Sequence, residues 1–451
     1  MTTNELEIKY RKILDLKPYA NSPRIHNRAK RQKLDKLLRR FGQIAPIITD
    51  GEGGIVDGHL VVELLKEIGH EKVATVEVCT NDPAEIRAIR LALNRVAQDA
   101  KWDNARLMTE FQELLDIGFD MSFTGFDQVE IDMTLSMEEP TSAITEDAPP
   151  AVDPDAVAVT RPGDLWVLGG NRVLCGDARD PAAMAHLFDG QTAQMVMCDP
   201  PYNVPIVGNV SGLGANHHRE FAMASGEMTS IQFTDFLADF LTTACTVLAD
   251  GAILFICMDW KHLPELFTAT GRAGLTPMNL CVWAKTNAGM GTFYRSQHEM
   301  VLAAKHGTAP HINNFELGKK GRSRSNLWTY RGMNVPGQER DDLLKLHPTV
   351  KPVALVADAI KDVSHRGSIV LDSFLGSGTT LIAAETTGRR CYGIEYDPLY
   401  VDLIVRRWMD HTGGTAMLSG TGETFEHREE IAHRNAEATD QSPAGNTNGG
   451  I

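Results

Sequence analysis

The chain has 451 residues, 43% of them hydrophobic and 23% charged, a composition typical of a globular protein long enough for two or three domains. Its net charge of -15 excludes a protein that coats nucleic acid through bulk positive charge. No apolar run approaches the ~20 residues of a membrane span, the first residues are polar, and the seven cysteines form no CxxC pair. We therefore expect a cytoplasmic protein with no membrane segment, no disulfide framework and no metal site.

Residues 1–135 predict a small α/β domain. Apolar residues at 34, 37, 38 and 41 share one helix face, and Gly42 ends that helix. A short strand (45–50), a helix closed by Gly69, a second strand (73–78) and a helical stretch (84–116) follow. The run 24–40 holds eight Arg or Lys (24, 28, 30, 31, 33, 36, 39, 40) against the single acid Asp35. Alone, such a run indicates either a solvated surface or contact with a polyanion.

The remainder of the chain divides into three parts. Residues 136–160 are acidic and rich in Pro, Ala and Thr, which predicts a linker. Residues 161–417 alternate short apolar runs, suited to buried parallel strands, with helices expected at 232–248, 353–363, 379–387 and 399–410. This alternation predicts a Rossmann-like doubly wound α/β sheet. Residues 418–451 are polar and predict a disordered tail.

A glycine-rich turn lies in the segment SIVLDSFLGSGTTLIAAETTGRRCYGIEYD. A predicted strand (368–371) leads into Gly376 and Gly378, a helix begins near Thr379, and a second strand ends at Glu395. Glycines let the backbone approach a nucleotide-like ligand, and an acid on the next strand accepts hydrogen bonds from two ribose hydroxyls. A phosphate-binding loop is the alternative, but it requires Lys where Thr379 and Thr380 stand.

A second motif, AQMVMCDPPYN, ends a predicted buried strand at Asp199. Pro200 and Pro201 stiffen the backbone and lack amide donors, which leaves their carbonyl oxygens free to accept. Tyr202 offers a flat face for an extruded base. The lone pair of an adenine N6 amine is delocalised into the ring, so acceptors at Asp199 and the Pro200 carbonyl would localise it for attack on a methyl sulfonium. The plainer alternative is a strand-ending turn.

Together these motifs resemble the amino-methylating DNA methyltransferases across residues 161–413. The Asp-Pro-Pro-Tyr block precedes the FxGxGTT block, which is the permuted order of that family. The resemblance implies a class I methyltransferase fold, S-adenosylmethionine as cofactor and double-stranded DNA as substrate. It also implies that Asp177, in VLCGDARD, contacts the cofactor adenine and that Lys351, in HPTVKP, lies near its methionine part. The implied cofactor residues are Asp177, Lys351, Asp372, Phe374, Gly376, Ser377, Gly378, Thr379, Thr380 and Glu395.

The resemblance also bears on the substrate. Asp at position 199 goes mainly with N6-adenine, whereas Ser is more typical of N4-cytosine, which stays an alternative. A C5-cytosine enzyme is disfavoured because no Pro-Cys occurs. Residues 203–229 are expected to form a mobile loop over the substrates. Residues 306–346 correspond to the target-recognition region, and its basic side chains are the expected DNA contacts: Lys319, Lys320, Arg322, Arg324 and Arg331.

Residues 6–78 resemble the N-terminal domain of ParB-like proteins, carried by GQIAPIITDGEGGIVDGHLVVELLKEIGHEKVATVEV. Leu60, Val61 and Val62 stand where the nucleotide-binding members have arginines, which speaks against nucleotide hydrolysis. We expect an accessory DNA-binding or partner-binding module, in an arrangement known from methyltransferases of bacteria and their phages. A homodimer and a partner restriction endonuclease are further expectations. The other functional classes considered are a non-enzymatic, partition-like adaptor and methylation of RNA or a protein glutamine.

Overall fold

The structure is a computed structural model. It describes residues 6–19, 28–99, 102–135, 152–153, 156–204, 226–286, 293–315, 324–330 and 351–440. The chain forms two compact units, Met1–Pro140 and Thr141–Ile451. No helix among the described residues is long and apolar enough to cross a membrane.

The first unit is a small α/β fold around a four-stranded sheet, ordered β1-β4-β2-β3. Strand β4 pairs antiparallel with β1 and parallel with β2. The predicted helix ending at Gly42 and the helix closed by Gly69 are both confirmed, whereas the stretch 84–116 forms two helices. Its elements are β1 (Lys9–Lys12), η1 (Ile13–Asp15), α1 (Arg28–Phe41), β2 (Ile47–Thr49), β3 (Ile55–Asp57), α2 (His59–Ile68), β4 (Lys72–Glu77), α3 (Pro83–Asp99), α4 (Asn104–Asp116), η2 (Met121–Phe123) and α5 (Gln128–Leu135).

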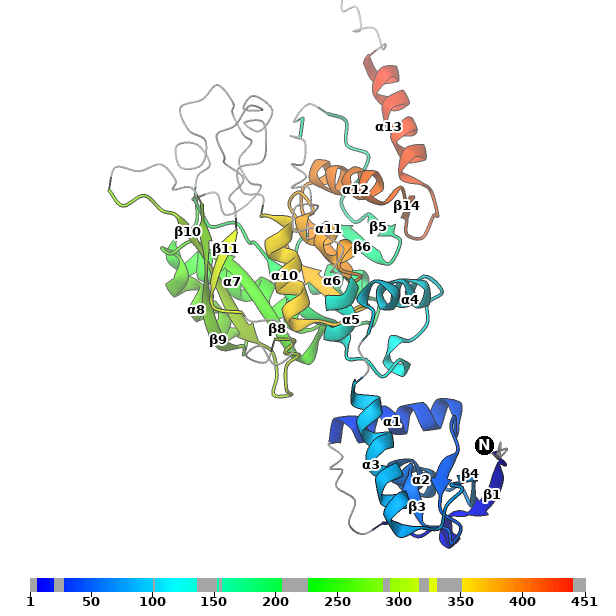
Figure 1. Ribbon diagram of the computed structural model, residues 1–451. Helices are drawn as coiled ribbons and strands as arrows, with labels where there is room; N and C mark the ends of the chain where they lie inside the picture. Colours follow the sequence, from blue (N-terminus) through cyan, green and yellow to red (C-terminus); the bar gives the residue numbers. More distant parts are fainter. Residues whose placement is uncertain are drawn as a thin grey trace, which may run out of the picture. The chain divides into compact units, whose positions relative to one another are not determined.

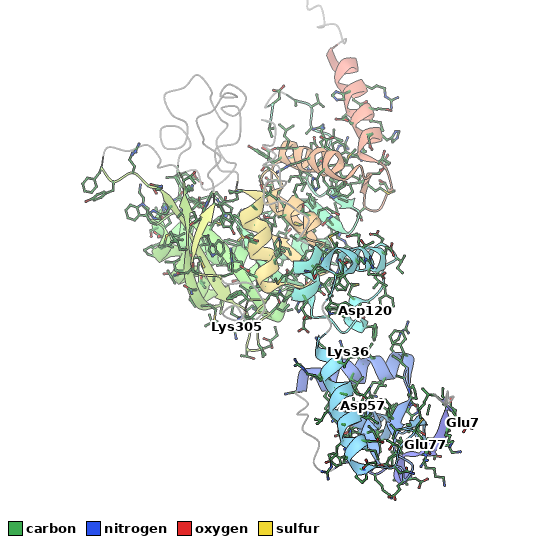
Figure 2. The ribbon with its side chains drawn as sticks, viewed as in Figure 1. Glu7, Lys36, Asp57, Glu77, Asp120 and Lys305 are labelled. Atoms are coloured by element: carbon green, nitrogen blue, oxygen red, sulfur yellow. The ribbon has the colours of Figure 1, made fainter. Side chains whose placement is uncertain are left out.

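Close packing at the turn before α2 explains one glycine of this unit. Gly58 has a φ of 98°, and a Cβ atom there would lie 2.7 Å from Ile47 Cδ1. Glycine is therefore required for both conformation and space. On the sheet, Glu77 of β4 accepts hydrogen bonds from Arg11 and Lys9 of β1, a partly exposed ion-pair cluster whose acid is labelled in Figure 2. The apolar side chains of the sheet and α2 form the core beneath.

Three short helical elements, α4, η2 and α5, close the first unit with a core of their own. Leu107, Phe111, Met121 and Ile131 are buried together in it. Asp103 caps α4 by accepting from the Arg106 amide. A helical cluster with a separate core is able to act as a module distinct from the sheet.

The second unit contains a sheet of ten strands within the described residues, ordered β11-β9-β10-β8-β7-β12-β13-β6-β5-β14. Its elements are β5 (Leu165–Leu168), β6 (Asn171–Cys175), α6 (Pro181–Phe188), β7 (Ala193–Cys198), α7 (Ser230–Cys245), β8 (Leu248–Met258), α8 (Leu263–Arg272), β9 (Thr276–Lys285), β10 (His298–Lys305), β11 (Leu327–Tyr330), α10 (Val353–Val363), β12 (Ile369–Asp372), α11 (Thr379–Thr386), β13 (Arg390–Glu395), α12 (Pro398–Thr412), β14 (Ala416–Leu418) and α13 (Phe425–Asp440).

The centre of this sheet is parallel, with β8, β7, β12, β13 and β6 running side by side. The expectation of parallel strands is wrong for β10, which pairs antiparallel with both β8 and β9. Apolar runs do not distinguish the two directions, because β10 is covered on both faces as a central parallel strand would be.

Helices cover both faces of the sheet (Figure 1). Side chains of α6, α7 and α8 pack in one apolar cluster, and those of α10, α11 and α12 pack in another on the opposite face. The predicted doubly wound α/β architecture is confirmed. It brings the ends of the parallel strands to one edge, where the predicted motifs lie.

The C-terminal region corrects the predicted tail. Residues 416–418 form β14, which pairs antiparallel with β5, and residues 425–440 form α13. Phe425 is buried and packs edge-to-face on Trp166, with ring centroids 5.2 Å apart. One buried aromatic in an otherwise polar segment anchors this helix, and average polarity concealed it. Residues 441–451 lie outside the described part.

Candidate active site

Four acidic residues meet at the carboxyl edge of the parallel strands. Asp199 follows β7, Asp372 ends β12, Glu395 ends β13 and Asp177 follows β6. Because β7, β12, β13 and β6 are consecutive neighbours, their ends form one continuous border. The structure therefore brings the two sequence motifs together, as a doubly wound sheet requires.

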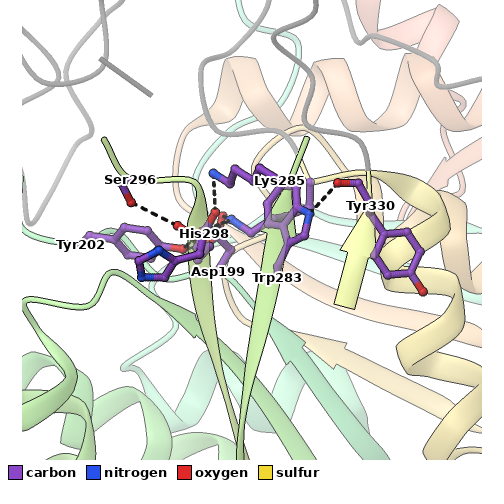
Figure 3. A network of polar contacts seen from close by, with 9 residues as sticks. Asp199, Tyr202, Trp283, Lys285, Ser296, His298 and Tyr330 are labelled. Carbon is purple, nitrogen blue, oxygen red and sulfur yellow. Dashed lines mark hydrogen bonds and ion pairs between the residues drawn. The ribbon is translucent and has the colours of Figure 1, made fainter. Parts of the chain in front are cut away.

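Asp199 is the centre of a network of charged and polar side chains (Figure 3). Its Oδ1 accepts from the Tyr202 hydroxyl at 2.5 Å, and its Oδ2 accepts from Lys351 Nζ at 2.5 Å. The Lys351 ammonium also lies 5.7 Å from the centroid of the Tyr202 ring. Lys351, expected beside the cofactor, thus reaches the Asp-Pro-Pro-Tyr block directly. Pro200 is buried and Pro201 is partly buried.

Glu299, in β10, completes this network and was missed by sequence reasoning. Its Oε1 accepts from Lys351 Nζ at 2.7 Å and lies within hydrogen-bond distance of the Tyr202 hydroxyl, whose single hydrogen Asp199 and Glu299 therefore share. Its Oε2 pairs with Lys285 Nζ of β9 at 2.9 Å. The signal that could have found it is a charged residue at the start of the apolar strand HEMVLAAK, because a glutamate is rarely buried unless it is paired.

The network balances two ammonium groups against two carboxylates. Burial raises the pKa of Asp199, as does the nearby charge of Glu299, although Lys351 opposes both. Burial alone would also raise the pKa of Glu299, but Lys351 and Lys285 outweigh it and lower that pKa. Burial and the two carboxylates raise the pKa of the Tyr202 hydroxyl well above its usual value, so it acts as a donor.

The glycine-rich turn and Glu395 form the second half of the edge. Glu395 Oε2 accepts from the Gly376 amide at 2.8 Å, and its Oε1 accepts from the Asp397 amide at 3.0 Å. Burial raises the pKa of Glu395 to about 7, although these amides oppose the shift. Burial likewise raises the pKa of Asp372 to about 7, while the Phe374 amide, 3.0 Å from its Oδ1, and the Thr380 side chain oppose it.

The start of α11 shows that the turn fits a bound nucleotide-like cofactor. Gly378 has a φ of 85°, and a Cβ atom there would lie 3.2 Å from Ile404. Gly376 also has a positive φ, with open space where its side chain would be. Ser373 Oγ is buried and has no hydrogen-bond partner among the described residues. A bare backbone, an open approach and an unsatisfied hydroxyl are what a close ligand would use.

The remaining predicted cofactor residues lie around the same turn. Phe374 packs edge-to-face on Phe240, with centroids 5.0 Å apart. The Ser377 carbonyl accepts from Arg407 at 2.9 Å, and Thr379 and Thr380 are buried in the first turn of α11. These residues therefore shape and hold the turn.

Asp177 is the outermost acid of the border and is clamped by Arg179. Both carboxylate oxygens accept from the guanidinium, at 3.0 and 2.7 Å, and the Arg179 amide donates to Oδ1 at 2.9 Å. The Arg179 hydrogen bonds lower the pKa of Asp177 against the opposing effect of burial. The neighbouring Gly176 amide donates to the Glu395 carbonyl at 2.9 Å, which keeps the two acids adjacent.

Asn203 is a second residue that sequence reasoning missed. It adopts a φ of 54° directly after Tyr202. Its side-chain amide donates to the Met228 carbonyl at 2.8 Å, and its Oδ1 accepts from the Gly226 and Met228 amides at 3.1 Å. Asn203 thus joins the two ends of the predicted loop, whose residues 205–225 lie outside the described part.

Arg324 corrects one predicted DNA contact. Its Nε donates to Asp362 Oδ2 at 2.9 Å and its guanidinium to the Tyr330 hydroxyl at 2.9 Å, and its side chain is 18% exposed. The guanidinium therefore joins the segment before β11 to α10 inside the domain instead of facing a phosphate. The other predicted contacts lie outside the described residues: Lys319, Lys320, Arg322 and Arg331.

The N-terminal basic run is partly neutralised within its own unit. Arg31 of α1 pairs with Glu63 and Glu67 of α2, and Arg39 pairs with Asp35. These exposed pairs leave less net charge on α1 than the sequence suggests. Among the described residues, no group of three or more His, Cys, Asp or Glu is placed to hold a metal ion.

Two family models match the chain. Residues 193–406 match the N6/N4 methyltransferase model, described as a DNA methylase, and residues 105–162 match the ParB-methyltransferase HTH domain. The first match includes Asp199, Asp372 and Glu395 of the strand border, and Asp177 precedes it. The second contains the helical cluster of α4, η2 and α5.

Two curated relatives of the chain also carry methyltransferase or methylase names. The type II methyltransferase M2.MboI of Moraxella bovis is 24% identical over 239 residues, 51% of this chain and 85% of the relative. The putative methylase YubD of Escherichia coli K12 is 26% identical over 212 residues, 46% of this chain and 78% of the relative. The solved structure of the M1.HpyAVI-SAM complex is 19% identical, with a TM-score of 0.39, and covers 52% of this chain and 97% of that chain.

The resemblance drawn from the two motifs is thereby confirmed at the level of the family, and the predicted cofactor, S-adenosylmethionine, is the one this family uses. The family covers both N6-adenine and N4-cytosine enzymes. The chain carries a DNA methylase domain of the N6/N4 amino-methyltransferase family, joined to a ParB-methyltransferase HTH domain.

Proposed function

We propose that the chain methylates the N6 amine of an adenine flipped out of duplex DNA, at a specific recognition sequence. The observation that supports this most is the position of the Asp199 carboxylate. It stands at the end of β7 next to β12, whose following turn carries the cofactor motif. Aspartate, instead of the serine more typical of N4-cytosine enzymes, at this position favours adenine as the target.

The proposed chemistry uses the residues of the Asp-Pro-Pro-Tyr block. Tyr202 stacks on the flipped base, while Asp199 and the Pro200 carbonyl accept the two N6 hydrogens. These hydrogen bonds return the lone pair to nitrogen for in-line attack. Bound S-adenosylmethionine supplies the methyl group. As the N–C bond forms, the amine becomes cationic and gives a proton to Asp199, whose raised pKa suits it to accept one.

Each cofactor residue has a proposed role. Glu395 accepts from the ribose hydroxyls, Asp177 contacts the adenine ring and the turn from Asp372 to Thr380 surrounds the ligand with backbone. Lys351 serves both halves of the site through its ion pair with Asp199. Lys319, Lys320, Arg322 and Arg331 are proposed to contact DNA from the target-recognition region 306–346.

The decisive experiment is long-read sequencing of DNA from cells that express the protein. We expect N6-methyladenine in one sequence context, lost in the isosteric Asp199→Asn variant. Asp410→Asn, an exposed position on α12, is the matched control and should modify DNA as the wild type does. N4-methylcytosine in place of methyladenine would replace the adenine proposal by its cytosine alternative. Failure to modify DNA, together with failure to bind the cofactor in calorimetry, would favour a non-enzymatic adaptor.

We further propose that the N-terminal region is an accessory DNA-binding or partner-binding module. The HTH match over residues 105–162 supports this role. The proposed boundaries are 1–135 for the ParB-like region, 136–160 for the linker and 161–417 for the methyltransferase domain. A cytoplasmic location, a homodimer and a cognate endonuclease stay predictions.

A further inference from the structure

Both oxygens of the Asp199 carboxylate are already engaged. Oδ1 accepts from the Tyr202 hydroxyl and Oδ2 from Lys351 Nζ, each at 2.5 Å. The proposed reaction requires one of these oxygens to accept an amine hydrogen of the target base. Each carboxylate oxygen can accept a second hydrogen bond, but the incoming amine competes with Tyr202 and Lys351 for the same carboxylate, and a buried donor displaced from one acceptor needs another.

Glu299 is placed to receive both donors. Its Oε1 already accepts from Lys351 Nζ at 2.7 Å and shares the single hydrogen of the Tyr202 hydroxyl with Asp199. Lys351 and Glu299 are 7% and 9% exposed, so water is a poor substitute for either partner. Losing contact with Asp199 would thus leave neither Lys351 nor Tyr202 unpaired.

The position of Glu299 is itself firmly held. It lies in β10, which is paired on one side with β8 and on the other with β9. Its Oε2 is anchored by Lys285 Nζ at 2.9 Å, and that ammonium in turn lies 4.5 Å from the Trp283 ring centroid. A carboxylate fixed from both sides is a preorganised acceptor.

We propose that Glu299 is a positioning residue that takes over the Tyr202 hydroxyl and the Lys351 ammonium when Asp199 exchanges them for the amine of the target base. The proposal rests on the proposed role of Asp199 but applies to either amine, because adenine N6 and cytosine N4 each carry two hydrogens. Glu299 acts through Lys351 and Tyr202 and does not touch the base.

The test is steady-state kinetics of Glu299→Gln, which keeps the shape of the side chain and removes its charge. Lys351 and Tyr202 then hold more tightly to Asp199 and compete with the amine. We expect kcat to fall ~10–100-fold, the range of one hydrogen bond to a charged group. The KM for DNA and the Kd for S-adenosylmethionine should change less than about twofold. Glu429→Gln on α13, which alters a partly exposed ion pair with Arg406 of α12, is the matched control.

A double-mutant cycle with Lys351→Met separates this role from a purely structural one. With Lys351 absent, Asp199 has one donor fewer to release, so adding Glu299→Gln should cost at most a few-fold more. Fully additive losses in kcat would contradict the proposal. So would a Glu299→Gln variant with wild-type kcat, or one whose loss is confined to KM.

Folding is checked by the melting temperature and cofactor binding of each variant. Should Glu299→Gln fail to bind cofactor, Glu299→Asp is the second variant, because it keeps the charge but withdraws the carboxylate from both donors. Its kcat must then fall for the proposal to hold. A wild-type protein that transfers no methyl group would overturn both proposals, whereas an active wild type with an equally active Glu299 variant overturns only this one.

Discussion

The catalytic cluster and the cofactor turn lie on the same sheet border but neutralise their carboxylates by different means. Asp199 and Glu299 face two ammonium groups, Lys351 and Lys285. Asp372 and Glu395 are held chiefly by backbone amides and the Thr380 side chain, and Lys351 acts on Asp372 only as a nearby charge.

The consequence is a difference in protonation. Ammonium partners keep Glu299 ionised despite its burial, whereas amides leave the pKa values of Asp372 and Glu395 at about 7. Glu299 faces two ammonium groups, whereas burial raises the pKa of Asp199 even beside Lys351, so it takes both lysines to outweigh burial here. The catalytic half should therefore depend on its lysines, and the cofactor half should respond to pH.

The largest expected effect is on folding, in Lys351→Met. Removing this ammonium leaves Asp199 and Glu299 buried without their shared cation, which typically costs about 3–5 kcal/mol. Urea denaturation, followed by circular dichroism, measures the change. Lys285→Met is the matched control: Lys285 also pairs with Glu299 but is 32% exposed, and it should cost about 1 kcal/mol or less. Equal losses of folding stability in the two variants would show that the burial of a lysine does not decide how much its ion pair contributes.

A smaller effect is expected on cofactor affinity in Glu395→Gln. Replacing the carboxylate weakens its proposed hydrogen bonds to the ribose by about 10–100-fold in Kd. Isothermal titration calorimetry with S-adenosylmethionine measures it. Asp199→Asn, at the other half of the border, should bind the cofactor within about twofold of wild type while losing methyl transfer. A cofactor Kd that moves in Asp199→Asn but not in Glu395→Gln would reverse the assignment of the two halves.

The smallest effect is the pH dependence of cofactor binding. With its pKa at about 7, Glu395 is mostly protonated at pH 6 and ionised at pH 8, and only the ionised form accepts from both ribose hydroxyls. Affinity should rise about tenfold over this interval, with protons released on binding. Calorimetry in buffers of different ionisation enthalpy counts those protons. A flat profile in the wild type, or an unchanged one in Glu395→Gln, contradicts the assignment.

The raised pKa of Glu395 also affects folding stability, which should fall with rising pH while cofactor affinity increases. A carboxyl whose pKa is raised in the folded state binds more protons there than in the unfolded chain. Glu395 and Asp372 should therefore make the protein less stable as the pH rises from about 4 to about 7. The loss of folding stability caused by these two carboxyl groups reaches its full size above about pH 7. Cofactor binding, which stabilises the folded state, offsets it there.

Local motifs made much of the border predictable. The strand ending at Asp199, the helix starting at Thr379 and the acid at Glu395 follow from spacing along one stretch of chain. The role of Glu299 could not be predicted in this way, because Glu299 contacts Lys351 only after the β9–β10 hairpin folds against β8. The two residues are 52 positions apart in the sequence. Tertiary pairing of this kind leaves almost no local signal.

The cluster of basic residues around Arg324 led to a wrong prediction for the same reason. Arg324 was predicted to face DNA from its basic neighbourhood, but Asp358 and Asp362 of α10 claim its guanidinium. The polar C-terminal region concealed α13 because Phe425 is the one fully buried side chain in the described part of that helix. Composition averages over windows, whereas folding responds to individual contacts.

The short outer strands of the large sheet have a consequence for self-association. Strand β11 has four residues and β14 has three, so neither outermost strand presents a long row of unpaired backbone groups. Short edges are poor templates for strand addition by another molecule. Truncation before Ala416 would remove β14 and so expose the backbone of its partner strand β5. It would also remove Phe425, which packs on Trp166. Loss of the C-terminal region would therefore reduce the solubility of the protein. It would affect the catalytic residues at the carboxyl ends of β7 and β12 less.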